Sequence, residues 1–186
     1  MEFDKSDDDL VKEFQKGSMV AFEHLVSRYQ FALVNFFYHQ TYNKVIAEDY
    51  AQDVFMKLFL ALGTYTPAGK FKYFLFRIAR NYLIDKKREK KRKEVSLSHA
   101  IDESGTELQD MVVVEDTDER GFLSEKVALS LLRLPEEHRT VIILSEYCNM
   151  DYREISEILG IPVGTIKSRM HNAILKLKEI LGNIPV

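Results

Sequence analysis

Side chains capable of nucleophilic catalysis are few and scattered in this sequence. Cys148 is the single cysteine, and with the distant His138 and His171 it offers a possible nucleophile and base. It falls at the end of an expected helix, where a thiol more often packs as a small apolar group. No glutamate lies three residues before any of the five histidines, and the H-E-x-x-H, G-x-x-x-x-G-K-[ST] and G-x-G-x-x-G motifs are absent. The sequence therefore predicts that the protein is not an enzyme.

One acidic cluster has the spacing of possible metal ligands. Asp49 and Asp53 lie one helical turn apart, with Glu48 beside them. No further ligand set accompanies them, so a face that contacts solvent or a partner protein explains the cluster better. We expect no metal ion and no cofactor.

A helix-turn-helix pattern occupies residues 152–181. A short amphipathic helix meets Gly160 and Ile161-Pro162, and a longer helix opens at Val163. Between residues 163 and 178 there are four basic residues and no acid, which suits phosphate contact with a few base-edge contacts. The alternative is a plain helical hairpin in a core, because the spacing of the apolar residues by itself also fits that structure.

Helical spacing divides the second helix of this pattern into two faces. The expected buried stripe comprises Ile166, Met170, Ala173, Ile174 and Leu177. The opposite face and its flanks hold the predicted DNA contacts: Thr165, Lys167, Ser168, Arg169, His171, Asn172 and Lys176.

A second nucleic-acid signal is an aromatic and basic segment. Residues 71–82 interleave Phe and Tyr with Lys and Arg, and residues 70–93 carry eleven basic and two acidic side chains. Bases of single strands stack on aromatic rings beside cations, at roughly 1–3 kcal/mol per base. Phe74, Ile78 and Tyr82 share one face and are expected in the core, and a merely solvated basic face is the alternative. The combination indicates binding of single-stranded or melted DNA.

Composition limits the remaining classes. The 186 residues have a net charge of −3 and are 46% apolar, which excludes wholesale disorder and allows one compact domain or two small ones. The lone cysteine fits a reducing compartment, the acidic N-terminus lacks the plan of a secretion signal, and no apolar run reaches the roughly 20 residues that span a bilayer. We expect a soluble, cytoplasmic protein.

The elements that must position these side chains are all helical. Residues 95–120 lack helical periodicity and include eight acids between residues 102 and 119, so we expect two small helical domains, 1–94 and 121–186, joined by a flexible acidic linker. Ser6, Ser18 and Asp151 are expected N-caps, and Gly63 a stop. The expected helices are 6–17, a long one from residue 18, 46–62, 70–93, 122–133, 136–148, 152–159 and 163–181.

These segments together resemble a known family. Residues 47–58 look like the polymerase-binding helix of sigma-70-type initiation factors, and residues 71–85 resemble their promoter-melting and −10-reading helix. Residues 134–139, 152–156 and 162–169 resemble the −35-reading domain. With only these two domains, the chain is similar to the small extracytoplasmic-function (ECF) group.

The resemblance implies roles for individual residues. Those implied to contact the polymerase clamp helices are Asp49, Gln52, Asp53, Phe55 and Leu58. Those implied to read or melt the −10 element are Tyr65, Lys70, Phe71, Tyr73, Phe74, Arg77, Arg80, Asn81, Lys86, Lys87 and Arg88. The implied −35 contacts are the outward residues of the helix-turn-helix. The chain departs from the family at Tyr73-Phe74, where members often carry tryptophan, and at Asn172 and Ile174, where they often carry arginine.

The resemblance also implies partners. These are core RNA polymerase, promoter DNA and an anti-sigma factor, with no small-molecule substrate and no membrane insertion. A 26-residue linker spans roughly 28 Å as a coil and about 90 Å extended, whereas two turns of DNA cover roughly 70 Å. Stretching the linker to this distance is reasonable if the polymerase holds it. The alternative is that the linker is only a solubilising tether between the two domains.

Two other classes of protein remain open. A conventional transcription regulator explains residues 122–181 equally well but leaves the aromatic and basic segment unexplained. A helical adaptor that binds only proteins predicts no salt-dependent binding of nucleic acid.

Overall fold

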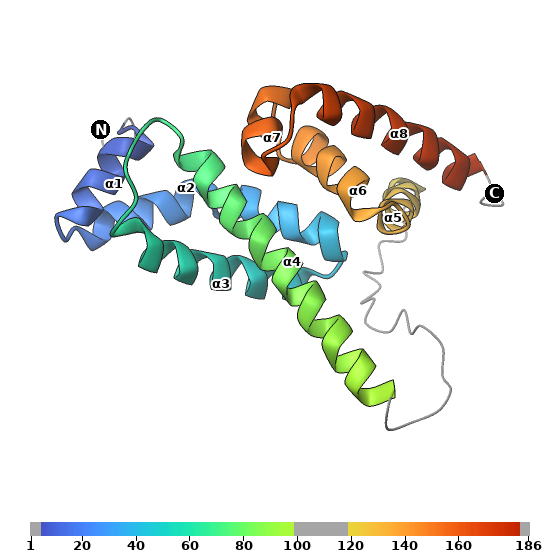
Figure 1. Cartoon of the computed structure of the whole chain (residues 1–186), viewed down its shortest axis with the longest axis horizontal. Helices are drawn as coiled ribbons and strands as arrows, with labels where there is room; N and C mark the ends of the chain where they lie inside the picture. Colours follow the sequence, from blue (N-terminus) through green and yellow to red (C-terminus); the bar gives the residue numbers. More distant parts are fainter. Residues whose placement is uncertain (1–4, 99–118, 183–186) are drawn as a thin grey trace.

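A computed structural model describes residues 5–98 and 119–182, and within these ranges every regular element is a helix (Figure 1). The all-α class is therefore confirmed. In chain order the elements are α1 (Asp7–Gln15), α2 (Met19–Thr41), α3 (Lys44–Leu62), α4 (Phe71–Ser98), α5 (Glu119–Leu132), α6 (Glu136–Ile142), the π-helical turn η1 (Ile143–Tyr147), α7 (Tyr152–Leu159) and α8 (Val163–Gly182).

The predicted linker is partly helical at its two ends. α4 runs to Ser98, past the expected end at residue 93, and α5 begins at Glu119. The run of basic side chains at the end of α4 did not stop the helix, because Lys, Arg and Glu are good helix formers. The rest of the predicted linker, with most of its acidic run, lies outside the described residues.

Helices α1 to α4 form one domain around an apolar core. α2 packs along α3, and α1 and α4 lie against this pair. Phe36 and Phe37 of α2 are buried, and the ring of Phe36 meets Phe76 of α4 edge to face at 5.8 Å. Leu58 of α3 is also fully buried. Each side chain of this kind stabilises the fold by about 1.5–3 kcal/mol through burial.

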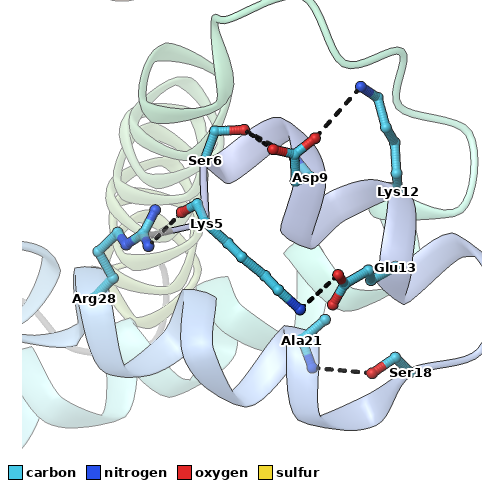
Figure 2. A network of polar contacts seen from close by, with 8 residues as sticks. All are labelled: Lys5, Ser6, Asp9, Lys12, Glu13, Ser18, Ala21 and Arg28. Carbon is cyan, nitrogen blue, oxygen red and sulfur yellow. Dashed lines mark hydrogen bonds and ion pairs between the residues drawn. The ribbon is translucent and has the colours of Figure 1, made fainter. Parts of the chain in front are cut away.

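The N-terminal helix α1 is attached to α2 by polar contacts (Figure 2). Ser6 caps α1, since its hydroxyl accepts a hydrogen bond from the Asp9 amide, as predicted. The ammonium of Lys5 pairs with Glu13 at 2.7 Å, and the carbonyl of Lys5 accepts a hydrogen bond from the Arg28 guanidinium at 2.8 Å. The bond from Arg28 joins the start of α1 to α2, and the other contacts lie within the α1 segment.

The second domain comprises α5, α6, η1, α7 and α8. The helix expected over 136–148 exists but changes to a π-helical turn from Ile143 to Tyr147. Pro135 is the N-cap residue of α6. Ile155 of α7 and Ile166 of α8 are fully buried, so the helix-turn-helix pair has its own packed interior.

The two domains touch each other. α2 contacts η1 and α5, and α4 contacts α7, while the last turns of α4 extend away from the other helices (Figure 1). Asn35 of α2 donates a hydrogen bond to the Tyr147 carbonyl at 2.8 Å, and the buried Gln40 donates to the Thr140 hydroxyl at 3.1 Å. This contact brings α4 beside the helix-turn-helix.

Candidate nucleic-acid and protein interfaces

The turn of the helix-turn-helix is determined by three local features. Asp151, a predicted N-cap, forms a capping box with Glu154 at the start of α7, and Gly160 ends that helix with a φ of 67°. The Ser156 hydroxyl donates to the Ile161 carbonyl at 2.6 Å, which satisfies one acceptor of the turn. Because these groups fix the turn, α8 leaves α7 in a defined direction.

The outward face of α8 carries most of the predicted −35 contacts. Lys167, Ser168, His171, Asn172 and Lys176 are exposed. This group therefore lies together on one accessible helical face, as the spacing predicted.

Three residues of α8 have a different exposure from the one that their predicted roles suggest. Thr165 is half-buried at the start of the helix, and Arg169 is half-buried and pairs with Glu137 of α6 at 2.8 Å. Ile174 was expected in the buried stripe, but 43% of its surface is exposed, so this expectation is wrong. The domain packs against α8 along Ile166, Met170 and Ala173, and this stripe is too narrow to cover residue 174.

The basic helix α4 presents a mixed surface. Among the predicted −10 contacts, Lys70, Arg77, Asn81 and Arg88 are exposed. The half-buried members of the same set are Tyr65, Tyr73, Phe74, Arg80, Lys86 and Lys87.

Phe71 does not belong to this surface. Its ring is 1% exposed and contacts Tyr29 at 5.4 Å and Tyr65 at 6.3 Å, so it is a core residue of α4. The buried face of α4 consists of Phe71, Leu75, Phe76, Ala79, Tyr82 and Leu83. The predicted core face is buried at Tyr82, whereas Phe74 and Ile78 pack against the core but are only half-buried.

The loop between α3 and α4 is held by α1. The Gln15 side-chain amide donates to the Leu62 carbonyl at 2.9 Å and to the Tyr65 carbonyl at 2.7 Å, and the Gly69 amide donates to Asp8 at 2.7 Å. Tyr65 stacks on Phe74 at 4.5 Å, and burial raises the pKa of its hydroxyl. Sequence reasoning missed Gln15 and Asp8, because contacts between residues so far apart leave no local pattern.

Most residues predicted to bind polymerase lie at the surface of α3. Asp49 and Gln52 are exposed, and Asp53 and Phe55 are half-buried. Leu58 is fully buried, so it packs inside the domain and cannot contact a partner in this structure.

Exposed apolar side chains extend this face beyond the predicted residues. Met56 and Leu60 are 65% and 79% exposed, and Phe59 is 37% exposed. Large apolar side chains at this exposure mark interaction sites when they cluster. Helical periodicity alone contained this signal, since residues 56 and 60 lie one turn apart on the face opposite Val54 and Leu58.

Polar contacts connect α3 to α4 beside this face. The Tyr82 hydroxyl donates to Asp53 at 2.5 Å, and burial together with this bond raises the pKa of Tyr82. The ammonium of Lys86 lies 5.2 Å from the centre of the Tyr82 ring, and that of Lys57 lies 5.8 Å from it. A groove lined by α3 and α4 residues, including Met56 and Leu60, runs along this junction.

The alternatives that involve catalysis or metal binding find no support in this geometry. Burial raises the pKa of the Cys148 thiol to about 12, which disfavours the reactive thiolate at neutral pH. Across residues 5–98 and 119–182, no group of three His, Cys, Asp or Glu side chains is arranged to hold a metal ion. Within the same residues, no helix is both long enough and apolar enough to cross a bilayer.

Comparisons with known proteins identify both domains. Residues 25–93 match the family described as sigma-70 region 2, and residues 124–177 match sigma-70, region 4. The chain is 32% identical to the ECF RNA polymerase sigma factor SigW of Bacillus subtilis, over 94% of this chain and 96% of that one. It is also 32% identical to the ECF RNA polymerase sigma-E factor of Haemophilus influenzae, over 96% and 94% of the two chains.

Solved structures give the same result for the fold. CnrH, solved in complex with the cytosolic domain of CnrY, matches 97% of this chain and 100% of its own with a TM-score of 0.71 at 23% identity. The sigma factor RpoE of Bartonella quintana, solved with the anti-sigma factor NepR, matches 88% of this chain and 98% of its own with a TM-score of 0.67 at 25% identity.

Proposed function

This chain belongs to the ECF group of the sigma-70 family, and from that membership we propose that it directs core RNA polymerase to a subset of promoters. It binds the polymerase, recognises a −10 and a −35 element, and performs no chemistry itself, because the polymerase supplies the active site. The observation that carries this proposal is the presence of both sigma-70 regions, in family order, on one chain.

In this proposal the C-terminal domain reads the −35 element. α8 enters the major groove with its exposed face, where Lys167 and Lys176 contact phosphates and Ser168, His171 and Asn172 reach base edges. Support comes from the common exposure of these five residues on a helix that the turn holds rigidly. Thr165 and Arg169 flank them.

The N-terminal domain is proposed to open the −10 element. The proposed DNA surface follows α4 from the loop residue Tyr65 through Arg77 and Asn81 to the basic residues 86–88. Tyr73 and Phe74 are the rings best placed for stacking, since Phe71 is buried.

The polymerase surface is proposed to lie on α3. Its polar contacts come from Asp49, Gln52 and Asp53, and its apolar centre from Met56 and Leu60, which the domain leaves exposed. Domains 1–94 and 121–186, with the linker between them, remain our proposed boundaries.

An anti-sigma factor is a further proposed partner, since the solved relative RpoE was captured with one. Acting with polymerase on the chromosome places the factor in the cytoplasm.

Transcription by core RNA polymerase, with and without this chain, tests the proposal. The variant Lys167→Ala with His171→Ala removes two proposed −35 contacts, and we expect at least about a tenfold loss of −35-dependent initiation with unchanged polymerase binding. Gln52→Ala with Leu60→Ala serves as the matched variant and should weaken co-elution with polymerase instead. Promoter use that is identical with and without the chain contradicts the proposal.

A further inference from the structure

The contact between the domains uses basic side chains at the start of α4, and two of them, Lys70 and Arg77, belong to the proposed −10 surface. Lys72 of α4 pairs with Glu154 of α7 at 2.9 Å, and Lys70 pairs with Glu157 at 3.1 Å. Arg77 donates a hydrogen bond to the Glu157 carbonyl at 3.1 Å. Two glutamates of the −35 domain therefore contact three basic residues near the start of α4, through two side-chain carboxylates and one main-chain carbonyl.

The two carboxylates pair with ammonium groups of the kind that bind nucleic-acid phosphates. A carboxylate and a phosphate accept the same charge-assisted hydrogen bonds from Lys and Arg. The Lys72–Glu154 pair is partly shielded from water, with side-chain exposures of 32% and 22%, so solvent screens it less than a free surface pair. Glu154 also completes the capping box of α7, and this second bond holds its carboxylate in position.

Further contacts extend the interface beyond the ion pairs. Asn35 and Gln40 of α2 donate hydrogen bonds to Tyr147 and Thr140, and Tyr147 lies against the His39 ring at 3.6 Å between centres. Both α2 and α4 of the N-terminal domain thus contact the second domain.

The interface is not packed like a domain core. A pocket of about 460 Å³ that is open to solvent lies between α4 and the second domain, lined by Arg80, Leu83 and Ile84 on one side and by residues including Glu136 and Arg169 on the other. Interfaces between domains that are polar and only partly closed allow the domains to move relative to each other.

This arrangement is incompatible with binding both promoter elements. α7 touches α4 and leads directly into α8, so the two reading helices lie within the width of one small domain. A 65-residue domain has a radius of gyration of about 11 Å, whereas two turns of DNA cover roughly 70 Å. The domains must separate before the factor can engage a promoter.

We propose that Glu154 and Glu157 act as an internal phosphate mimic that masks the −10 surface of α4 in the free chain. The inference rests on the proposed −10 role of α4. The fraction of open molecules limits the apparent affinity for DNA, because a closed molecule must open before it binds. Polymerase binds the two domains in separated positions and thereby removes this limit on DNA binding.

The test uses the full chain with Glu154→Gln and Glu157→Gln, which keeps the capping box because glutamine also serves at that position. Small-angle X-ray scattering at low salt measures domain separation, and fluorescence anisotropy measures binding of a labelled 20-nucleotide oligo-dT strand. We expect the radius of gyration to rise by roughly 5 Å and binding to tighten about threefold to tenfold.

Two control variants separate masking from a general charge effect. Glu23→Gln with Glu179→Gln makes the same change of charge at exposed positions on α2 and near the end of α8, and should behave as wild type. Asn35→Ala with Gln40→Ala removes uncharged contacts of the interface and should expand the chain and tighten binding without any change of charge.

The outcomes distinguish the two proposals. A wild-type chain already as expanded as the variants, or a Glu154/Glu157 variant that stays compact, overturns the internal mimic. Scattering measures domain separation without DNA, and anisotropy measures DNA binding separately. Variants that expand but bind oligo-dT no better than wild type overturn the proposal that the contact masks the −10 surface. Absence of oligo-dT binding by every chain also contradicts the −10 role of α4.

Discussion

Replacing Gly160 with alanine tests whether the helix-turn-helix depends on one left-handed residue. Gly160 has a φ of 67° and its amide donates to the Ser156 carbonyl at 2.8 Å, which ends α7. A Cβ at this position would meet no atom within 4 Å, so the cost of Gly160→Ala is conformational and not steric. A left-handed conformation costs an L-residue about 1–2 kcal/mol, so we expect the second domain to lose about 1 kcal/mol.

Gly164→Ala is the matched control. Gly164 lies in the first turn of α8 without a positive φ, and a Cβ there also meets nothing within 4 Å. Alanine is a better helix former than glycine and restricts the unfolded chain, so this variant should gain about 0.5–1 kcal/mol. The two substitutions make the same chemical change at positions four residues apart and are expected to act in opposite directions.

Amide hydrogen exchange followed by mass spectrometry measures both effects. Peptides from α7 and α8 report the local free energy of opening, without assuming that both domains unfold together. Exchange should be roughly fivefold faster in Gly160→Ala, because 1.4 kcal/mol corresponds to a factor of ten. An unchanged or slower rate in Gly160→Ala, or equal effects of both substitutions, would refute the conformational explanation.

Two further predictions concern α3 and the interface between the domains. Leu58→Ala should destabilise the first domain by about 2–5 kcal/mol in urea unfolding. Leu60→Ala, at a side chain 79% exposed, should leave stability unchanged and weaken polymerase binding. Equal losses of stability in the two variants would contradict the buried and exposed faces assigned to α3. Burial lowers the pKa of His39 to about 4 from an ordinary value near 6.5, so the unfolded or separated state binds more protons between these values. The contact between His39 and Tyr147 should therefore weaken as the pH falls from 6.5 to 4, and scattering should show the domains separating. His39→Phe should remove this pH dependence, and an identical pH profile in the variant would contradict the role given to His39.

Much of the fold was predictable because its signals are local. Ser6, Ser18 and Asp151 cap the helices that they were expected to cap, and Gly160 adopts the left-handed turn. Each of these groups acts on backbone atoms within a few residues, so neighbouring sequence suffices to identify it. The family resemblance rests on the same kind of signal, namely short motifs within single helices.

The faces of the helices were less predictable. Phe71 and Phe74 are both aromatic and lie in the same turn of α4, yet the core of the first domain buries only Phe71. Leu58 and Leu60 differ in the same way on α3, and Ile174 lies beyond the reach of its domain's core. Periodicity gives the relative angle of two residues on a helix, but the neighbouring helices determine which angle is covered.

The sequence by itself thus determined the helices, their caps, the basic and acidic segments and the family to which they belong. Only the tertiary structure decided which side chains remain available at each surface and brought Lys72 to Glu154, 82 positions along the chain. The physical reason is range: capping and periodicity act within one or two turns of a helix, whereas burial and ion pairing depend on where separate helices meet.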